Sequence, residues 1–263
     1  MATVDRRRSN VLRAAVILSF FVAATARADG VYRLDPPVDI PVTAASYLTL
    51  LVGYSFAADF IRPRCPCNSR EINAFDRGVV GNHSDAADLV STLTVVGAVA
   101  APAFYDWDKD RLTVGFFDDA VVLVETLGVN AALVTVAKDV VQRPLPRTYA
   151  GDPALLNSPG GYRSFYSGHT STAFAALGYL AYTLRLHGVR GAWPWILDAV
   201  VGTSVAAERV LAGRHFYTDV IVGAAAGALV GWAVPALHRK SGLVLSAGRV
   251  GENGVLFNLA GVF

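Results

Sequence analysis

Three short segments contain residues whose types and spacing could carry out nucleophilic chemistry, and one of them contains a histidine and an aspartate. His215 and Asp219 are four residues apart, so a helix would place both on one face. An aspartate at that spacing can accept a hydrogen bond from one ring nitrogen and leave the other nitrogen free as a nucleophile. Arg209 precedes this pair and adds a positive charge. The alternative is a His–Asp pair on a helix surface, which has no catalytic role.

The second segment is Ser167-Gly168-His169, which stands directly before an apolar stretch. Ser167 is placed to cap a helix, and Gly168 allows backbone N–H groups to approach a ligand closely. The N-terminus of a helix binds anions through these N–H groups and the helix dipole. His169 would lie in the first turn, where it could donate a proton to a leaving group. Taken alone, a Ser-Gly-His segment is more often a simple helix cap.

The third segment contains Lys138, Arg143 and Arg147 and follows another apolar stretch directly. Cations gathered beside an apolar helix suit a multiply charged anion such as phosphate. Pro144 and Pro146 would end the helix and keep the loop extended. The alternative is a flank of positive charge, which is common at the ends of membrane helices.

In this order the three segments resemble the motifs of the type 2 phosphatidic acid phosphatase superfamily, which also includes secreted acid phosphatases and vanadium haloperoxidases. Its motifs are a lysine, six residues and Arg-Pro; then Pro-Ser-Gly-His; then Ser-Arg, five residues, histidine, three residues and aspartate. The resemblance covers roughly residues 42–240. It implies that His215 is the nucleophile, His169 the general acid and Asp219 the partner that orients His215. It also implies that phosphate is bound by the other matched residues: Lys138, Ser167, Gly168 and Arg209.

The chain departs from these motifs at three positions. Tyr166 replaces the proline of the second motif, and Glu208 replaces the serine of the third. Leu145 occupies the arginine position of the first motif. Arg143 and Arg147 lie two residues to either side of Leu145 and are candidates to bind phosphate in its place. If neither does so, phosphate binding and activity would be impaired.

The resemblance implies a metal-independent phosphatase that hydrolyses a phosphomonoester or diphosphate through a phosphohistidine, without a cofactor. The apolar surroundings of the motifs favour a lipid phosphate or a prenyl diphosphate as the substrate, and membrane lipid as the environment. Three alternatives stay open. They are a metal-dependent hydrolase with His169, His215 and Asp219 as ligands, a haloperoxidase that holds vanadate, and a non-catalytic membrane protein of the same fold.

The composition indicates a protein whose surface faces lipid. The chain has 263 residues, of which 53% are hydrophobic and 17% charged, and its mean hydropathy is +0.41. Soluble domains carry about 25% charged residues. The net charge of +2 is spread without a basic patch, which argues against a nucleic-acid partner. Cys65 and Cys67 are too close to join distant segments and lack a second pair at zinc spacing, so they indicate a local loop feature.

Six apolar stretches predict helices, because each is too long for an ordinary strand and is rich in Ala, Leu and Val. Several approach the roughly 20 residues that cross a membrane. Their approximate bounds are 42–61, 86–105, 120–137, 171–186, 192–207 and 217–237. Gly223, Gly227 and Gly231 line one face of the last stretch and would allow close helix packing. Near the C-terminus, Gly251-Glu252-Asn253-Gly254 separates two apolar runs and predicts a hairpin.

We therefore expect an all-α, membrane-embedded bundle of about six helices with a short C-terminal β-hairpin-like tail. Arg6 to Arg8, an apolar run and Ala26-Arg27-Ala28 fit a signal peptide. The expected organisation is a signal peptide or N-terminal anchor over residues 1–28, a linker over 29–41, the helical phosphatase domain over 42–240 and the tail over 241–263. No oligomeric state is indicated.

We expect the protein in a membrane, of the bacterial inner-membrane type, with its active site on the periplasmic side. Arginine is enriched in cytoplasmic loops, and by this rule the charged residues of the chain support two opposite orientations in the membrane. A cytoplasmic first loop is favoured by the arginines at 62, 64, 70 and 77. The opposite arrangement is favoured by Arg185, Arg190 and the basic residues at 238–240. A periplasmic site would be simplest to explain if the stretch 42–61 did not span.

Overall fold

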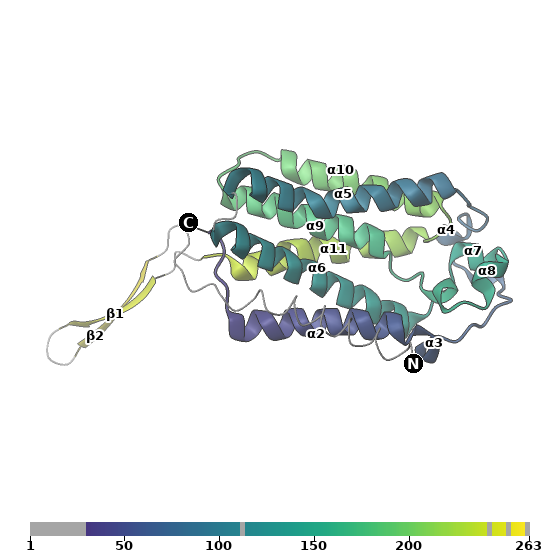
Figure 1. Ribbon diagram of the computed structural model, residues 1–263, viewed down its shortest axis with the longest axis horizontal. Helices are drawn as coiled ribbons and strands as arrows, with labels where there is room; N and C mark the ends of the chain where they lie inside the picture. Colours follow the sequence, from purple (N-terminus) through teal and green to yellow (C-terminus); the bar gives the residue numbers. More distant parts are fainter. Residues whose placement is uncertain (1–29, 111–113, 241–243, 251–253, 261–263) are drawn as a thin grey trace, which may run out of the picture.

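The protein is a helical bundle extended along one axis (Figure 1). The computed structural model describes residues 30–110, 114–240, 244–250 and 254–260. The long helices are α2 (Pro36–Ser55), α5 (Asp85–Asp110), α6 (Val114–Val141), α9 (Gly168–Leu186), α10 (Trp193–Leu211) and α11 (Tyr217–His238). Short helices lie in the connections: α3 (Ala57–Phe60), η2 (Ser69–Glu71), α4 (Ala74–Arg77), α7 (Pro146–Tyr149), α8 (Pro153–Leu156) and η3 (Pro159–Tyr162). The predicted signal peptide or anchor, residues 1–28, lies outside the described residues.

The predicted fold class, an all-α membrane-embedded bundle of about six helices with a β-hairpin-like tail, was wrong in its number of helices. The connections between the long helices contain additional single-turn helices. Among the described residues, three helices are long and apolar enough to cross a membrane. These cover Asp85–Asp106, Gly115–Tyr149 and Tyr217–His238. The short helices have no apolar period that a sequence could reveal, since they are set by local caps such as Asn73 and Asp152.

The other long helices differ from these three in local ways. The stretch expected over 42–61 is interrupted, because α2 ends at Ser55 and α3 follows separately. The first turns of α9 are polar, and α10 contains Asp198, Glu208 and Arg209. Helix α2 also starts earlier than expected, at Pro36, so the predicted linker over residues 29–41 is helical in its second part. Proline at the first helical position has a φ angle that already suits a helix.

Helix α9 is the central element, and it packs against α5, α6, α10 and α11. The predicted close packing of the glycine face is confirmed, because α11 lies with this face directly on the backbone of α9. A Cβ atom added to Gly227 would lie 2.2 Å from the carbonyl oxygen of Ser171, and one added to Gly223 would lie 2.7 Å from that of Ser167. This contact fixes the N-terminus of α9 against the N-terminal half of α11.

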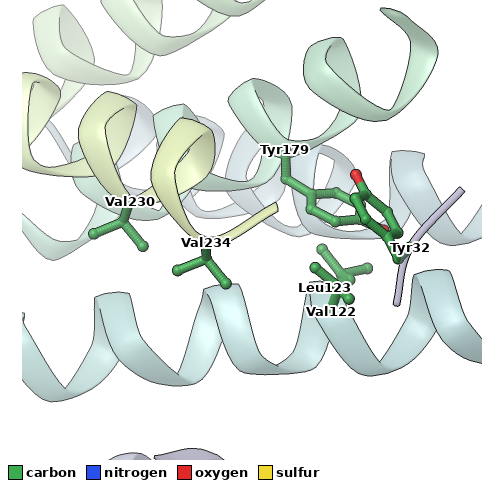
Figure 2. Close-up of a cluster of buried hydrophobic side chains, with 6 residues drawn as sticks. All are labelled: Tyr32, Val122, Leu123, Tyr179, Val230 and Val234. Atoms are coloured by element: carbon green, nitrogen blue, oxygen red, sulfur yellow. The ribbon is translucent and has the colours of Figure 1, made fainter. Parts of the chain in front are cut away.

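A cluster of buried apolar side chains joins α6, α9 and α11 toward the end of the bundle where the chain enters α2 (Figure 2). Tyr32 and Tyr179 stack with ring centroids 6.1 Å apart. The Tyr32 hydroxyl lies 2.6 Å from Thr183 Oγ1, so the buried polar atom is satisfied. The N-terminal segment is thereby anchored to the bundle at the end opposite α7 and α8.

The outer surface of the long helices is apolar, with large side chains such as Leu93, Val140, Leu229 and Leu237 more than half exposed. A soluble monomer does not expose such an extended apolar surface. Together with the three helices of membrane-spanning length, this surface identifies a membrane protein.

Two peripheral features lie outside the packed helices. Cys65 and Cys67 form a disulfide in the connection between α3 and α4, as a local feature of that loop. Beyond α11, strands β1 (Val244–Val250) and β2 (Gly254–Ala260) pair antiparallel, with Val244 opposite Ala260. The residues between the strands, 251–253, where the turn was expected, lie outside the described residues.

Candidate active site

His215 lies in the short connection between α10 and α11 with its side chain buried. Its Nδ1 atom is 2.7 Å from the carbonyl oxygen of Ser164. Because a carbonyl oxygen only accepts hydrogen bonds, Nδ1 must carry the proton. Nε2 is then the unprotonated nitrogen of the neutral ring, which is the state that a nucleophile requires.

Asp219 orients His215 indirectly, and this differs from the direct hydrogen bond that the sequence suggested. The nearest atoms of the two side chains, Nδ1 and Oδ2, are 3.9 Å apart. Instead, Asp219 accepts hydrogen bonds from Ser164 Oγ at 2.5 Å and from the Phe216 amide at 3.0 Å. Ser164 therefore connects the two residues, because its hydroxyl binds the aspartate and its carbonyl binds the imidazole.

Arg143 lies behind this pair and holds Asp219. Its guanidinium group donates to Asp219 at 2.6 Å and to Asp76 at 2.8 Å, and it lies 4.0 Å from the centroid of the Phe216 ring. Both carboxylates are fully buried. Arg143 was expected to bind phosphate, but its donors are directed to these acids, so the geometry gives it a positioning role.

Arg147 is also engaged by the protein. Its Nε donates to the carbonyl oxygen of Ala212 at 2.8 Å, and a terminal nitrogen lies 3.1 Å from Asp85. These contacts fix the loop that precedes His215, so Arg147 too acts by positioning. Leu145, at the arginine position of the first motif, is buried, and its amide binds the carbonyl oxygen of Gly161.

Lys138 lies near the end of α6 and points into the bundle. It is buried, and its ammonium group donates to the carbonyl oxygen of Arg163. Its Cε atom is 3.9 Å from a Cβ atom built on Gly168. Lys138 is thus beside the first turn of α9, as the motif assignment requires.

The first turn of α9 provides backbone donors for an anion. Ser167 is the N-cap, and its hydroxyl oxygen accepts from the Thr170 amide at 3.4 Å. The Ser167 amide binds the carbonyl oxygen of Asp219 at 3.0 Å, which joins the second motif to the third. The amides of Gly168 and His169 belong to the helix positions that have no intrahelical acceptor. Such amides favour binding of an oxyanion.

Arg209 reaches the site from α10 and is held there by Asp88 of α5. One terminal nitrogen of Arg209 donates to Asp88 and, at 3.1 Å, to Ser91 Oγ. Asp88 also binds Arg214, at 2.6 and 3.0 Å. The Nε atom of Arg209 is buried without a hydrogen-bond partner in the described part of the chain. This unused guanidinium donor is available to bind an anion.

The electrostatic environment keeps both histidines neutral in the ligand-free protein. Burial lowers the pKa of His169 to about 4, and the charge of Arg209 acts in the same direction. Burial likewise lowers the pKa of His215 to about 3. Lys138 and Arg209 both lower the pKa values of these two histidines, so all four groups lie within electrostatic reach of one another. His169 Nε2 lies 3.3 Å from the Thr92 hydroxyl oxygen.

The structure thus brings the motif residues together, and it adds residues that the sequence did not reveal. Asp76 and Ser164 position the His215–Asp219 pair, and Arg214 adds a cation near His169. Arg214 is adjacent to His215 in sequence and could have been noticed for that reason. Asp88 is visible in the sequence as an acid within an apolar stretch. Asp76 lies in a loop where no pattern distinguishes it.

The contact between Asp88 and Arg209 leads to a prediction. An anionic ligand must compete with the Asp88 carboxylate for the guanidinium donors of Arg209. We expect Asp88→Asn to lower the inhibition constant of inorganic phosphate by up to about tenfold, or about 1.4 kcal/mol. Asp59→Asn, at an exposed position, is the matched control. A weaker inhibition by phosphate in Asp88→Asn would show instead that the carboxylate is needed to hold Arg209 in place.

Comparisons with known proteins find the superfamily whose motifs the sequence resembles. The model of the PAP2 superfamily matches residues 119–243. A segment of 70 residues is 40% identical to the lipid A 1-phosphatase of Porphyromonas gingivalis, and it covers 26% of this chain and 15% of that protein. The chain therefore spans a minor part of the length of this curated relative.

Two solved structures are similar to the chain. The structure of Aquifex aeolicus LpxE is 25% identical, covers 62% of this chain and 96% of its own, and has a TM-score of 0.45. The transmembrane PAP2-type phosphatidylglycerolphosphate phosphatase of Bacillus subtilis is 22% identical, with coverages of 74% and 94% and a TM-score of 0.43.

The segment matched by the family model contains all three motifs, from Lys138 to Asp219, and so confirms the resemblance seen in the sequence. The similarity to the PAP2 superfamily thus lies over residues 119–243, slightly less than half of the chain.

Proposed function

We propose that this membrane protein is a metal-independent lipid phosphatase that uses His215 as its nucleophile. The observation that supports this most directly is the fixed tautomer of His215, whose Nδ1 is 2.7 Å from the Ser164 carbonyl oxygen. The ring is buried, and Lys138 and Arg209 lie within electrostatic reach of it, where their charges would suit a phosphoryl group. The name of the curated relative, a lipid A 1-phosphatase, supports a lipid phosphate as the substrate class.

The proposed reaction has two steps. Nε2 of His215 attacks phosphorus, a nitrogen–phosphorus bond forms, and the bond between phosphorus and the leaving oxygen breaks. The substrate brings a proton on its singly protonated phosphate group, this proton passes to the neutral His169, and His169 donates it to the leaving oxygen. A water molecule then attacks phosphorus, gives its proton to His169 and releases inorganic phosphate with His215 restored. Lys138, Arg209 and the amides of the first turn of α9 stabilise the charge on the remaining oxygens.

The rival metal-dependent mechanism is disfavoured by the positions of the side chains. In the described part of the chain, the groups of ligand atoms close enough for one ion do not include His169, His215 and Asp219. His215 Nδ1 and both Asp219 oxygens already have protein partners. The three side chains therefore do not form a common ligand set.

An assay on the full chain in detergent micelles tests the proposal, with phosphatidic acid and a prenyl diphosphate as the two probes. We expect release of inorganic phosphate that is insensitive to a chelator and inhibited by vanadate, with phosphatidic acid the better substrate. Rapid quenching should trap an acid-labile phosphoenzyme that is missing in His215→Gln. Loss of activity with a chelator would establish the metal-dependent alternative, and halide oxidation with vanadate and peroxide would establish the haloperoxidase.

The low pKa values of the histidines predict an acid-shifted pH profile. A nucleophilic imidazole must be unprotonated, and the pKa of His215 of about 3 means that it stays neutral down to that pH. A histidine with an ordinary pKa near 6.5 would instead lose activity below about pH 6. We expect kcat/KM to stay high at pH 5 and to fall on the acid side only as the pH approaches 3. It should also fall above about pH 6, as the substrate phosphate loses its second proton. An acid limb near pH 6 in kcat/KM, with the fold intact, would contradict this.

We also propose that the active site faces the periplasm in an inner membrane. The disulfide between Cys65 and Cys67 lies at the same end as the site, because the Cys65 amide binds the Tyr162 hydroxyl at 2.9 Å. Disulfides persist in oxidising compartments such as the periplasm. Two of the arginines at this end donate to protein carbonyl groups, Arg64 to Gln142 and Arg77 to Ile72, which gives them a structural role.

Labelling with a membrane-impermeant thiol reagent in intact cells tests this orientation. Ala150→Cys places a thiol at the site end, after α7, and Arg190→Cys places one at the other end, between α9 and α10. The native cysteines are disulfide-bonded and do not compete. We expect Ala150→Cys to be labelled and Arg190→Cys to be protected until the cells are opened. The reverse pattern would place the site in the cytoplasm.

A further inference from the structure

A group of three buried ligand atoms lies at the end of the bundle opposite the active site. Asp39 of α2, Glu125 of α6 and His238 of α11 converge there, and their ligand atoms all lie within 4.8 Å of one another. Each residue is more than nine-tenths buried. The three residues come from helices that are far apart in sequence, so their meeting is a feature of the tertiary fold.

The hydrogen bonds of His238 define which atom faces the acids. Its Nδ1 lies 2.8 Å from the carbonyl oxygen of Val234 and therefore carries a proton. Its Nε2 lies 3.2 Å from Asp39 Oδ1 and 3.5 Å from Glu125 Oε2. In a neutral ring the Nε2 lone pair would thus point at two carboxylate oxygens, and this arrangement is repulsive without a positive charge between them.

Adding one proton to His238 would not give every polar atom of this group a partner, because Glu125 would still lack one. If His238 were doubly protonated, Nε2 could donate to Asp39, but Glu125 Oε2 is a buried atom with no hydrogen-bond partner in the described part of the chain. Two carboxylates and one imidazolium would also leave a net negative charge in a buried position, which is costly. A divalent cation would neutralise both carboxylates and use the free oxygen of Glu125.

The distances suit a transition-metal ion. Tetrahedral zinc binds nitrogen and oxygen ligands at about 2.0–2.1 Å, which separates neighbouring ligand atoms by about 3.3–3.4 Å. The two separations from His238 Nε2, 3.2 and 3.5 Å, lie on either side of this value. Metal-bound histidines commonly donate their other ring N–H to a backbone carbonyl, as His238 does to Val234. Asp39 is also held by the backbone: its second oxygen, Oδ2, accepts a hydrogen bond from the Asp35 amide at 2.6 Å.

We propose that Asp39, Glu125 and His238 form a structural site for a zinc-like divalent cation, which fastens α2 to α6 and α11. The mixed set of two carboxylates and one imidazole favours zinc over magnesium or calcium, which prefer oxygen ligands alone. The site leaves one tetrahedral position for water. It is separate from the phosphate chemistry and does not depend on the proposed function.

Zinc binding to the full-length, tag-free protein in detergent tests the proposal. After treatment with a chelator, zinc should bind at about one ion per chain in calorimetry and in metal analysis, and it should raise the melting temperature. We expect Glu125→Gln, which keeps the shape of the side chain, to weaken zinc binding by more than about 100-fold. Asp39→Asn should have a similar effect and serves as a second variant if Glu125→Gln does not fold.

Two control variants locate the ion. His187→Gln alters a second group, formed with Asp106 and Asp119, whose ligand atoms are also close together. His215→Gln alters the active site. Both should bind zinc as the unaltered protein does. The proposal is overturned if the unaltered protein binds no zinc, if Glu125→Gln binds it with unchanged affinity, or if His187→Gln or His215→Gln loses it.

Discussion

Replacing His215 with glutamine should lower kcat by at least about 10⁴-fold, because the amide cannot act as the nucleophile of the first step. Glutamine has nearly the same reach as histidine and can still donate to the carbonyl oxygen of Ser164, so the local fold should be retained. The affinity for inorganic phosphate should change little, since Lys138, Arg209 and the helix amides remain in place. The measurement is steady-state release of phosphate together with phosphate inhibition or binding.

A matched variant separates this effect from general damage. His83→Gln changes an exposed histidine near Asp85, at the same end of the bundle, and should leave kcat unchanged. If His215→Gln kept more than about one-hundredth of the activity while folded, another group would have to be the nucleophile. In that case the role of His215 would be limited to positioning.

Replacing Arg143 with methionine should cause the largest loss of stability among the site variants. Arg143 neutralises Asp76 and Asp219, both fully buried, at 2.8 and 2.6 Å. Its removal leaves two buried carboxylates without their cation, and breaking a buried ion pair typically costs about 3–5 kcal/mol. The expected results are a lower unfolding free energy in mixed micelles and a lower kcat, because Asp219 and Ser164 no longer fix His215.

Kinetics distinguish this positioning role from phosphate binding by Arg143. A positioning residue should affect mainly kcat, whereas a phosphate ligand should raise KM and weaken phosphate inhibition. Arg143→Lys retains a charge but lacks the planar fork that spans two carboxylates, so it should rescue stability only in part. Arg70→Met, at an exposed position, should change stability by no more than about 0.5 kcal/mol. An increase in KM with unchanged kcat in Arg143→Met would contradict the positioning role.

Local spacing made much of the site predictable from the sequence. The positions of His215 and Asp219 in the third motif, and the capping pattern of Ser167, depend on residues close together in the chain. The contacts that join these segments do not follow from residue types, because they use backbone groups such as the Ser164 carbonyl and the Ser167 amide. Any residue could supply them, so no sequence pattern marks them.

The direction of a charged side chain was similarly beyond the sequence. Charge alone suggested that Arg143 would bind phosphate, but whether a guanidinium points into a site or behind it depends on distant acids such as Asp76. For the fold, the long apolar stretches predicted α5, α6 and α11 well because lipid contact requires continuous apolar surface. Helix α2 begins within a proline-bearing segment, and the single-turn helices have no periodicity, so both escaped prediction.

The segment from Arg163 to Ser167 serves as a common template for all three motifs. The Arg163 carbonyl accepts a hydrogen bond from Lys138, and the Ser164 carbonyl accepts one from His215. The Ser164 hydroxyl donates to the Asp219 carboxylate, and the Ser167 amide donates to the Asp219 carbonyl. Three of these contacts require no particular side chain in the template. The contact with Lys138 therefore allows any side chain at position 163, because the lysine binds the backbone carbonyl of that residue. An insertion or deletion within these five residues, by contrast, would displace nucleophile, cation and orienting acid at once.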